Sequence, residues 1–276
     1  VSVLEKSLLD KNTWLSLLQA PLDEAAAQLE AHGYAAAQQD VMQAIDQVQR
    51  DTVETLLSIT RQRALLELFL LQTDAHNLNV LYKCAVTGRD ATPLLLQGGA
   101  FDPELLAACV RCGDFASLGP GFARHLDGVD KDTPPRLISA AIDRAIFAHI
   151  HDTVRDCGVP TLREYFEQRA DAVNALARSR AAALGWEAQK CEQMLVEAPG
   201  KSVWQVPEDF NTFERELNRR TYALLAQGRY DGDGIVRIAC YLVAKTAECR
   251  NLRLVFAAKA AGLPLTADEI LPEGVA

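Results

Sequence analysis

Short motifs that could do chemistry are scattered along the chain, and none of them is complete. Gly200–Ser202 has the residue types that end a phosphate-binding loop, but the earlier glycine that such a loop needs is replaced by Leu195. Asp231–Gly234 resembles a fragment of a calcium loop, yet the position that requires glutamate is Leu242. We therefore expect a connecting loop and a polar turn at these two places, without bound nucleotide or calcium.

Thiols and imidazoles also occur in suggestive pairs. Cys109 and Cys112 could form half of a zinc site or a redox pair, but no second pair with ligand spacing follows. His149 and His151 are two residues apart in an expected helix, so they point to different faces. No Ser-His-Asp or Cys-His arrangement stands out. We expect no catalytic residue, no metal ion and no cofactor.

One polar pattern does recur. In three places an acidic residue stands three positions before an asparagine, and a glycine stands eleven positions after it. The three copies are Asp74, Asn77 and Gly88; Asp171, Asn174 and Gly185; and Glu248, Asn251 and Gly262. Because the chain has few asparagines, chance is a poor explanation, and the pattern indicates an internal repeat.

The spacing suits a helix. Eleven residues make about three turns, so the asparagine and the glycine share one stripe, and the glycine stands where a helix ends. The residue seven after asparagine is small, as Cys84, Ala181 and Ala258, although Arg178 departs from the apolar stripe. We expect each asparagine to be a buried amide that hydrogen-bonds the backbone of a neighbouring element, with the acid completing the network. A ligand-binding or catalytic amide is the alternative, but an active site is seldom repeated with its unit.

The elements that would carry these residues are all helices. Alanine, leucine, glutamate and arginine are abundant, and no run alternates as a strand would, so we expect an all-α fold. Asp10 precedes an apolar run as a helix cap would. From Tyr34 to Thr87 there is neither proline nor glycine, which predicts one very long helix or two with a bend. Loop-like junctions at 97–103 and 197–207 divide the chain into units 1–100, 101–200 and 201–276.

Charge and hydropathy exclude several classes of partner. The net charge is −9, which argues against nucleic acid and against an anionic membrane surface. The most apolar run, near Ala64–Leu71, contains Glu67 and is too short to cross a bilayer. The seven cysteines are odd in number and lie in apolar stretches, as expected of reduced thiols in the cytosol.

Longer stretches carry a resemblance to a known family. They are Glu5–Leu9 through Trp14–Leu18, Asp74–Leu78 with Lys83 and Gly88, Asp102-Pro103 with Gly113–Phe115, and Glu248–Arg253 with Lys259–Leu263. Together they resemble the C/d family of V-type (A-type) ATPase subunits, named C in bacteria and archaea and d in eukaryotes. The family usually has an aromatic- and arginine-rich start and a longer charged end, so we expect both ends here to be trimmed or divergent.

The resemblance implies a non-catalytic subunit for ATP-driven ion transport or ATP synthesis. Three similar helical units would form a pseudo-three-fold funnel on the cytoplasmic face of the proteolipid ring, peripheral to the membrane, and would receive the central-stalk subunits. The isolated chain is expected to be a monomer. Two alternatives come from other classes: a helical-repeat scaffold with a concave face, and an all-α enzyme with its site in the bundle core. The enzyme would need clustered acids or histidines, and no such motif is found.

Overall fold

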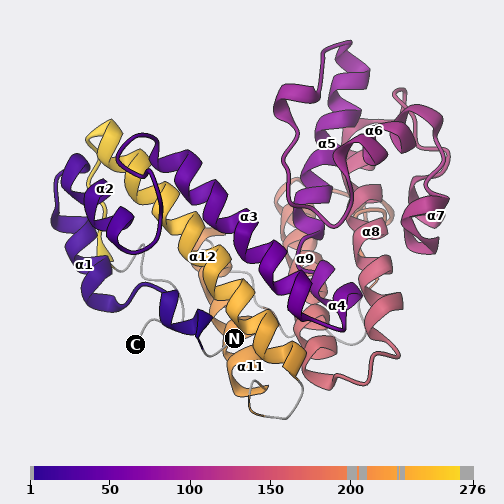
Figure 1. The fold of residues 1–276 in the computed structure, drawn as a ribbon. Coiled ribbons are helices and arrows are strands. Elements are labelled where there is room, and N and C mark those ends of the chain that lie inside the picture. The colour runs from indigo at the N-terminus through magenta and orange to yellow at the C-terminus, as the bar shows by residue number, and fades with distance from the viewer. Residues whose placement is uncertain (1–2, 198–203, 205–209, 229, 231–233, 268–276) are drawn as a thin grey trace. The chain divides into compact units, whose positions relative to one another are not determined.

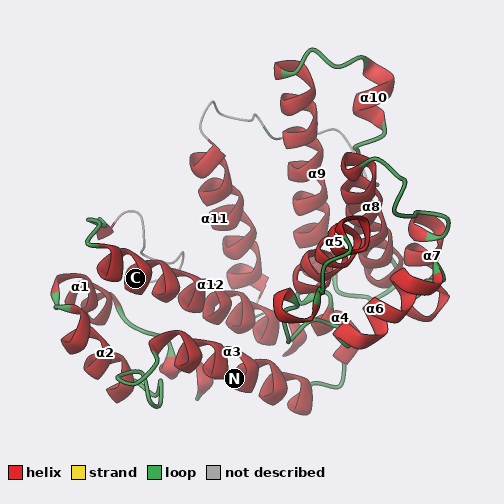
Figure 2. Cartoon of the chain, turned by 90° about the horizontal axis from the view of Figure 1, so that it is seen from above, coloured by secondary structure: helices red, strands yellow, loops and turns green. Residues whose placement is uncertain are grey.

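Helices and the loops between them make up the part of the protein that can be described. The computed structural model describes residues 3–197, 204, 210–228, 230 and 234–267 (Figure 1). No strand occurs in these ranges, and Figure 2 shows only helices and loops there. The all-α fold class expected from the sequence is therefore confirmed.

The chain divides into two compact units. The first unit joins residues 1–61 to residues 218–276, and the second comprises residues 62–217. The first unit is thus built from both ends of the chain, with the second inserted between them. The three units at 1–100, 101–200 and 201–276, and their funnel arrangement, stay predictions.

The first unit is organised around its last helix. Its elements are η1 (Leu4–Ser7), α1 (Lys11–Gln19), α2 (Leu22–Ala31), α3 (Val41–Ile59), the later part of α11 (Phe210–Gly228), and α12 (Gly234–Ala261). α12 runs along α3 and also contacts α2 (Figure 1). Trp14, Leu29 and Ile45 pack with Phe256 of α12 in one apolar core. The Asp10 carboxylate accepts a hydrogen bond from Thr13 N–H at 2.8 Å, so the predicted helix cap is confirmed.

α12 is long because nothing in it stops a helix before Gly262. It contains no proline and no glycine after Gly234, and Gly262 ends it in the left-handed conformation with φ of 66°. Lys259 near its end donates to the carbonyl oxygens of Leu18 (2.9 Å) and Ala20 (2.6 Å). These carbonyls lie at the end of α1, where helical hydrogen bonds run out, so the lysine ties the two helices together.

The second unit is centred on α8. Its elements are α4 (Arg63–Glu67), α5 (Leu71–Thr87), η2 (Thr92–Leu94), α6 (Pro103–Cys112), η3 (Ala116–Leu118), α7 (Pro120–Leu126), α8 (Pro135–Val154), α9 (Pro160–Ala183), α10 (Ala188–Glu192) and the start of α11. α8 contacts α4, α5, α7 and α9, and α5 also contacts α6. The helices α6 to α9 each begin with proline, whose fixed φ and missing N–H suit the first helical position.

The stretch from Tyr34 to Thr87 differs from the sequence prediction. It forms a turn and then three helices, α3, α4 and α5, so the expectation of one or two helices was wrong. Thr60 ends α3 with extended backbone angles, and Leu65, Leu66 and Leu68, in and just after α4, are all buried. Buried residues this close together in sequence cover too wide an arc for one face of a straight helix. A bend in the chain lets each of these leucines be buried, and the bend forms without proline or glycine.

Candidate functional site

The first copy of the recurring motif forms a two-sided clamp on a loop. Asn77 lies on α5 and is fully buried. Its Nδ2 donates to the carbonyl oxygen of Leu96 at 2.8 Å, and its Oδ1 accepts from the Leu96 N–H at 2.8 Å. One amide therefore satisfies both backbone groups of a single residue, much as a paired strand would. We call this arrangement an asparagine clamp.

Asp74 extends the first clamp by one turn of α5. Its carboxylate accepts from the N–H groups of Ala100 (2.8 Å) and Phe101 (3.3 Å). Burial of the carboxylate raises its pKa to about 6, although these hydrogen bonds act in the opposite direction. A Cβ on Gly99 would lie only 2.2 Å from Asp74 Oδ1, so the loop can approach the carboxylate only because Gly99 has no side chain.

The second copy repeats the clamp on α9. Asn174 Nδ2 donates to the carbonyl oxygen of Val196 at 3.0 Å, and its Oδ1 accepts from the Val196 N–H at 2.8 Å. The clamped residue is 22 positions after the asparagine, compared with 19 in the first copy. Asp171 is half-buried, and burial raises its pKa while Arg178 counteracts the rise. The same two-bond geometry thus recurs with a loop of different length.

The third copy uses its acid differently. Glu248 on α12 is buried, and its carboxylate accepts from the Leu9 N–H (2.6 Å) and from the Tyr34 hydroxyl (2.7 Å). Lys245, also buried, pairs with the same carboxylate. Asn251 is buried too, and Arg250 Nε donates to its Oδ1 at 3.4 Å. The acid therefore holds residues near the N-terminus, whereas Asp74 holds the loop that follows its own helix.

Further polar contacts continue the line of Glu248 along α12. Arg237 forms an ion pair with Glu5, with Nη2 and Oε2 2.6 Å apart. Tyr241, one turn later, has its hydroxyl 3.1 Å from Ser7 Oγ. The segment that begins at Glu5 thus follows one stripe of α12 toward Glu248. The partners of this segment could not be read from the sequence, because they are more than 230 residues away in the chain.

The glycines have the same role in all three copies, and all but one of the stripe residues are buried. Gly88, Gly185 and Gly262 have φ of 69°, 60° and 66°, so each is in the left-handed conformation just after its helix. The stripe residues between each asparagine and glycine are buried, apart from the exposed Arg178; the buried ones are Leu81, Cys84, Ala181, Val255 and Ala258.

A comparison with known protein families identifies one that matches most of the chain. A family model described as ATP synthase (C/AC39) subunit matches residues 1–203, well over half of the 276 residues. The chain belongs to this family. The resemblance inferred from the sequence is thereby confirmed. The matched residues of this C/AC39 chain include the clamps of Asn77 and Asn174, while the motif around Asn251 lies beyond them. No curated protein matches the chain.

The motifs that suggested chemistry are separated or lie outside the described residues. Gly200–Ser202 and Asp231–Asp233 are outside them. Cys109 is buried on α6, whereas Cys112 is exposed at its end. Within the described ranges, no group of three or more His, Cys, Asp or Glu side chains is arranged to hold a metal ion. No helix in those ranges is both long and apolar enough to cross a membrane.

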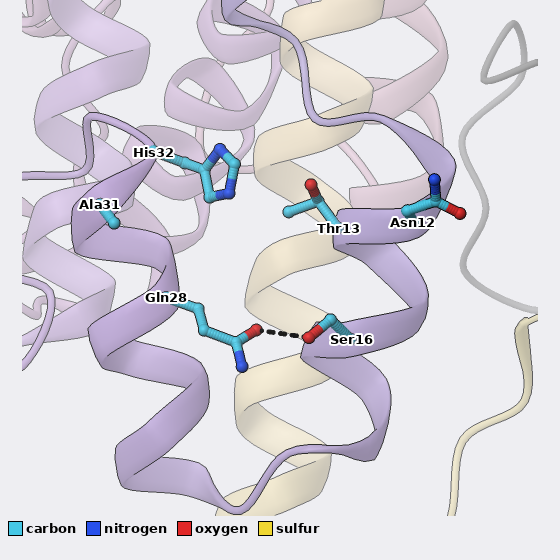
Figure 3. A pocket seen from close by; sticks show the side chains of 6 residues that line it. All are labelled: Asn12, Thr13, Ser16, Gln28, Ala31 and His32. Carbon is cyan, nitrogen blue, oxygen red and sulfur yellow. Dashed lines mark hydrogen bonds between the residues drawn. The ribbon is translucent and has the colours of Figure 1, made fainter.

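A shallow polar groove lies between α1 and α2. It has a volume of about 360 Å³ and is lined by Asn12, Thr13, Ser16, Gln28, Ala31 and His32 (Figure 3). Ser16 donates to Gln28 Oε1 at 2.9 Å across the groove. His32 is the one ionisable side chain in the lining, and it interacts electrostatically with the nearby Asp10 carboxylate, which caps α1.

Proposed function

We propose that this C/AC39 chain is a non-catalytic coupling subunit of a V-type (A-type) rotary ATPase. It would link the central shaft to the membrane proteolipid ring, for ATP-driven ion transport or ATP synthesis. The observation that carries the proposal is membership of the C/AC39 family.

The proposed architecture has three similar helical units around a pseudo-three-fold axis. The matching clamps of Asn77 and Asn174 support it, because each fixes a loop to a helix through both backbone groups of one residue. The left-handed glycine after each motif-bearing helix supports it further. A three-fold helical socket would sit on the cytoplasmic face of the ring, peripheral to the membrane, and hold the foot of the shaft.

The clamps suit a part that carries load. A loop held only by its ends yields under force, because few contacts resist its local opening. An amide that binds both backbone groups of a loop residue, inside the protein and away from water, adds resistance at that point. Torque would then pass through the loops into the helices with little deformation.

Native mass spectrometry of the purified chain with the central-stalk subunits from the same source tests the proposal. We expect a complex with one copy of each subunit. A second mixture, with the proteolipid ring in nanodiscs, should show the chain bound to the ring. The matched controls are Asn77→Ala, which removes one clamp, and His76→Ala, an exposed neighbour on α5. The clamp variant should bind more weakly and the neighbour variant normally.

A folded chain that forms no complex would contradict the proposal. If circular dichroism shows a folded chain that binds neither the stalk subunits nor the ring, the coupling proposal is wrong. The chain would then be better explained as a helical-repeat scaffold for another partner.

A further inference from the structure

Two helices of the second unit, α7 and α8, pack backbone against backbone at one glycine. A Cβ on Gly121 of α7 would lie 2.7 Å from the backbone nitrogen of His149 and 3.1 Å from the carbonyl carbon of Ala148. Any side chain at Gly121 would force the two helices apart. α7 is short, seven residues, so this packing and a few side chains must hold it in place.

One imidazole lies against this contact from α8. His149 has its ring 5.2 Å from the ring of Phe122 on α7 and 6.2 Å from that of Phe101, measured between centroids. Its Nδ1 is 3.3 Å from the position of a Cβ on Gly119. Burial lowers the pKa of His149, and Asp152 only partly offsets this effect, as does Glu67 of α4.

A second imidazole faces α8 from α7. His125 Nε2 is enclosed and has no hydrogen-bond partner among the described residues, and the same holds for Nε of Arg144 on α8. Burial lowers the pKa of His125; the nearby cations Arg144 and Arg124 act in the same direction, and Glu197 acts against them. A proton on this ring would place a further positive charge beside the guanidinium of Arg144.

Ion pairs also tie α7 to its surroundings, but loosely. Arg124 lies 3.6 Å from a carboxylate oxygen of Asp152 on α8 and 3.7 Å from one of Glu197. Arg124 is about half exposed, with 49% of its side chain accessible, so solvent screens both pairs. The hold on α7 therefore depends mainly on the uncharged interface around Gly121, His125 and His149.

We propose that α7 is a pH-released element, which stays docked on α8 while His125 and His149 are neutral and detaches when both imidazoles take up protons. The carboxylates that act on these rings, Asp152 and Glu67 on His149 and Glu197 on His125, would balance the two positive charges only in part. The released segment would be 119–131, while the rest of the second unit stays folded. Release would make the part of α8 around Ala148 and His149 available to solvent under acid conditions. This release of α7 does not depend on the role proposed for the chain in an ATPase.

The loop held by Asp74 should respond to acid in the opposite direction. Burial raises the pKa of Asp74 to about 6, so protonation favours the folded arrangement of that carboxyl. Mild acid would therefore loosen α7 and leave the loop at Ala100 and Phe101 bound to Asp74. The two opposite responses within one unit distinguish local release of α7 from general acid unfolding.

Hydrogen exchange with mass spectrometry at pH 7.5 and 5.5, corrected for intrinsic rates, measures the release. A free imidazole has an ordinary pKa of about 6.5, so at pH 5.5 about ten rings are protonated for each neutral one. If the ring cannot be protonated while α7 is docked, the equilibrium between docked and released α7 shifts toward release by about tenfold, and two such rings shift it by up to about a hundredfold. Exchange in 119–131 should rise by a factor within that range, while exchange in α5 should not rise. His125→Gln with His149→Gln should remove the dependence, and the exposed His76→Gln should keep it.

Each single substitution provides a second measurement if the double variant does not fold. His125→Gln and His149→Gln should each remove part of the pH dependence while circular dichroism at pH 7.5 stays that of the natural chain. Exchange in 119–131 that does not change with pH would overturn the proposal. An unchanged pH dependence in the folded histidine variants would overturn it as well.

Discussion

Replacing Asn77 with alanine tests the clamp most directly. The substitution removes both hydrogen bonds to Leu96 and leaves the N–H and carbonyl groups of that residue without their partner. The rest of α5 should be unaffected, because alanine is the best helix former. The perturbation is therefore confined to the loop between η2 and α6.

The expected cost follows from the two bonds and their surroundings. Asn77 is fully buried, but the Leu96 side chain is 49% exposed, so water can reach part of the opened site. We assign about 1 kcal/mol to each hydrogen bond, or about 2 kcal/mol in total. That amount raises the opening equilibrium of the loop about 30-fold.

The assay has a local and a global part. Hydrogen exchange of peptides that cover 92–101 should increase about 30-fold, whereas peptides from α8 should change little. Urea unfolding, followed by circular dichroism, should show a smaller shift, because the loop can open without the core. His76→Ala, on the exposed side of α5, should change unfolding by less than about 0.5 kcal/mol.

One outcome would contradict the role assigned to Asn77. If Asn77→Ala folds and its loop exchanges at the rate of the natural chain, the amide does not hold Leu96 in solution. The recurrence of acid, asparagine and glycine would then need an explanation other than the clamp.

Three further predictions concern the neighbouring polar groups. Gly99→Ala should destabilise the second unit by about 1–3 kcal/mol in urea unfolding, because the new Cβ would meet the Asp74 carboxylate. Asp74 has a folded-state pKa of about 6 against an ordinary 3.8, so the folded state binds this proton more tightly than the unfolded state does. The resulting stabilisation, up to about 3 kcal/mol, should be present at pH 4 and lost as the pH rises through 6. Asp74→Asn should remove this part of the dependence of stability on pH. Glu248→Gln should cost about 3–5 kcal/mol, because it leaves Lys245 charged and buried, and adding Lys245→Met should recover part of that loss.

Each of these predictions has a contrary outcome. Normal stability of the Gly99 variant would mean that the loop moves away from Asp74 without cost. A pH profile that is the same for Asp74 and its asparagine variant would show that this carboxyl does not titrate in the window. If Glu248→Gln with Lys245→Met is less stable than Glu248→Gln alone, the unpaired buried charge of Lys245 is not the cause of the lost stability.

The all-α fold class could be predicted from the sequence, because helix formation depends on local composition and spacing. The acid, asparagine and glycine lie on one helix each, so their periodicity is readable. The clamped partners were not readable, since Leu96 and Val196 lie at different distances from their asparagines and offer only backbone groups. A backbone partner leaves no residue type in the sequence to recognise.

Contacts between distant parts of the chain were missed for a related reason. The pairing of Glu248 with Tyr34 and with the Leu9 N–H becomes visible only when the two ends of the chain are folded together. The available signal was Lys245, a lysine three residues before Glu248 on the same helix. The division of Tyr34–Thr87 into three helices also depends on tertiary packing, since no residue type marks the bends.

The construction of the first unit from both chain ends has a consequence for biosynthesis. Trp14 and Leu29 share their core with Phe256, which the ribosome adds only after the whole of the second unit. The second unit can fold while translation continues, but the apolar faces of α1 and α2 must wait for α12. A nascent chain that stalls before α12 would therefore expose the apolar faces of α1 and α2. Chaperones or proteases would then bind these N-terminal helices, although the segment that is missing is C-terminal.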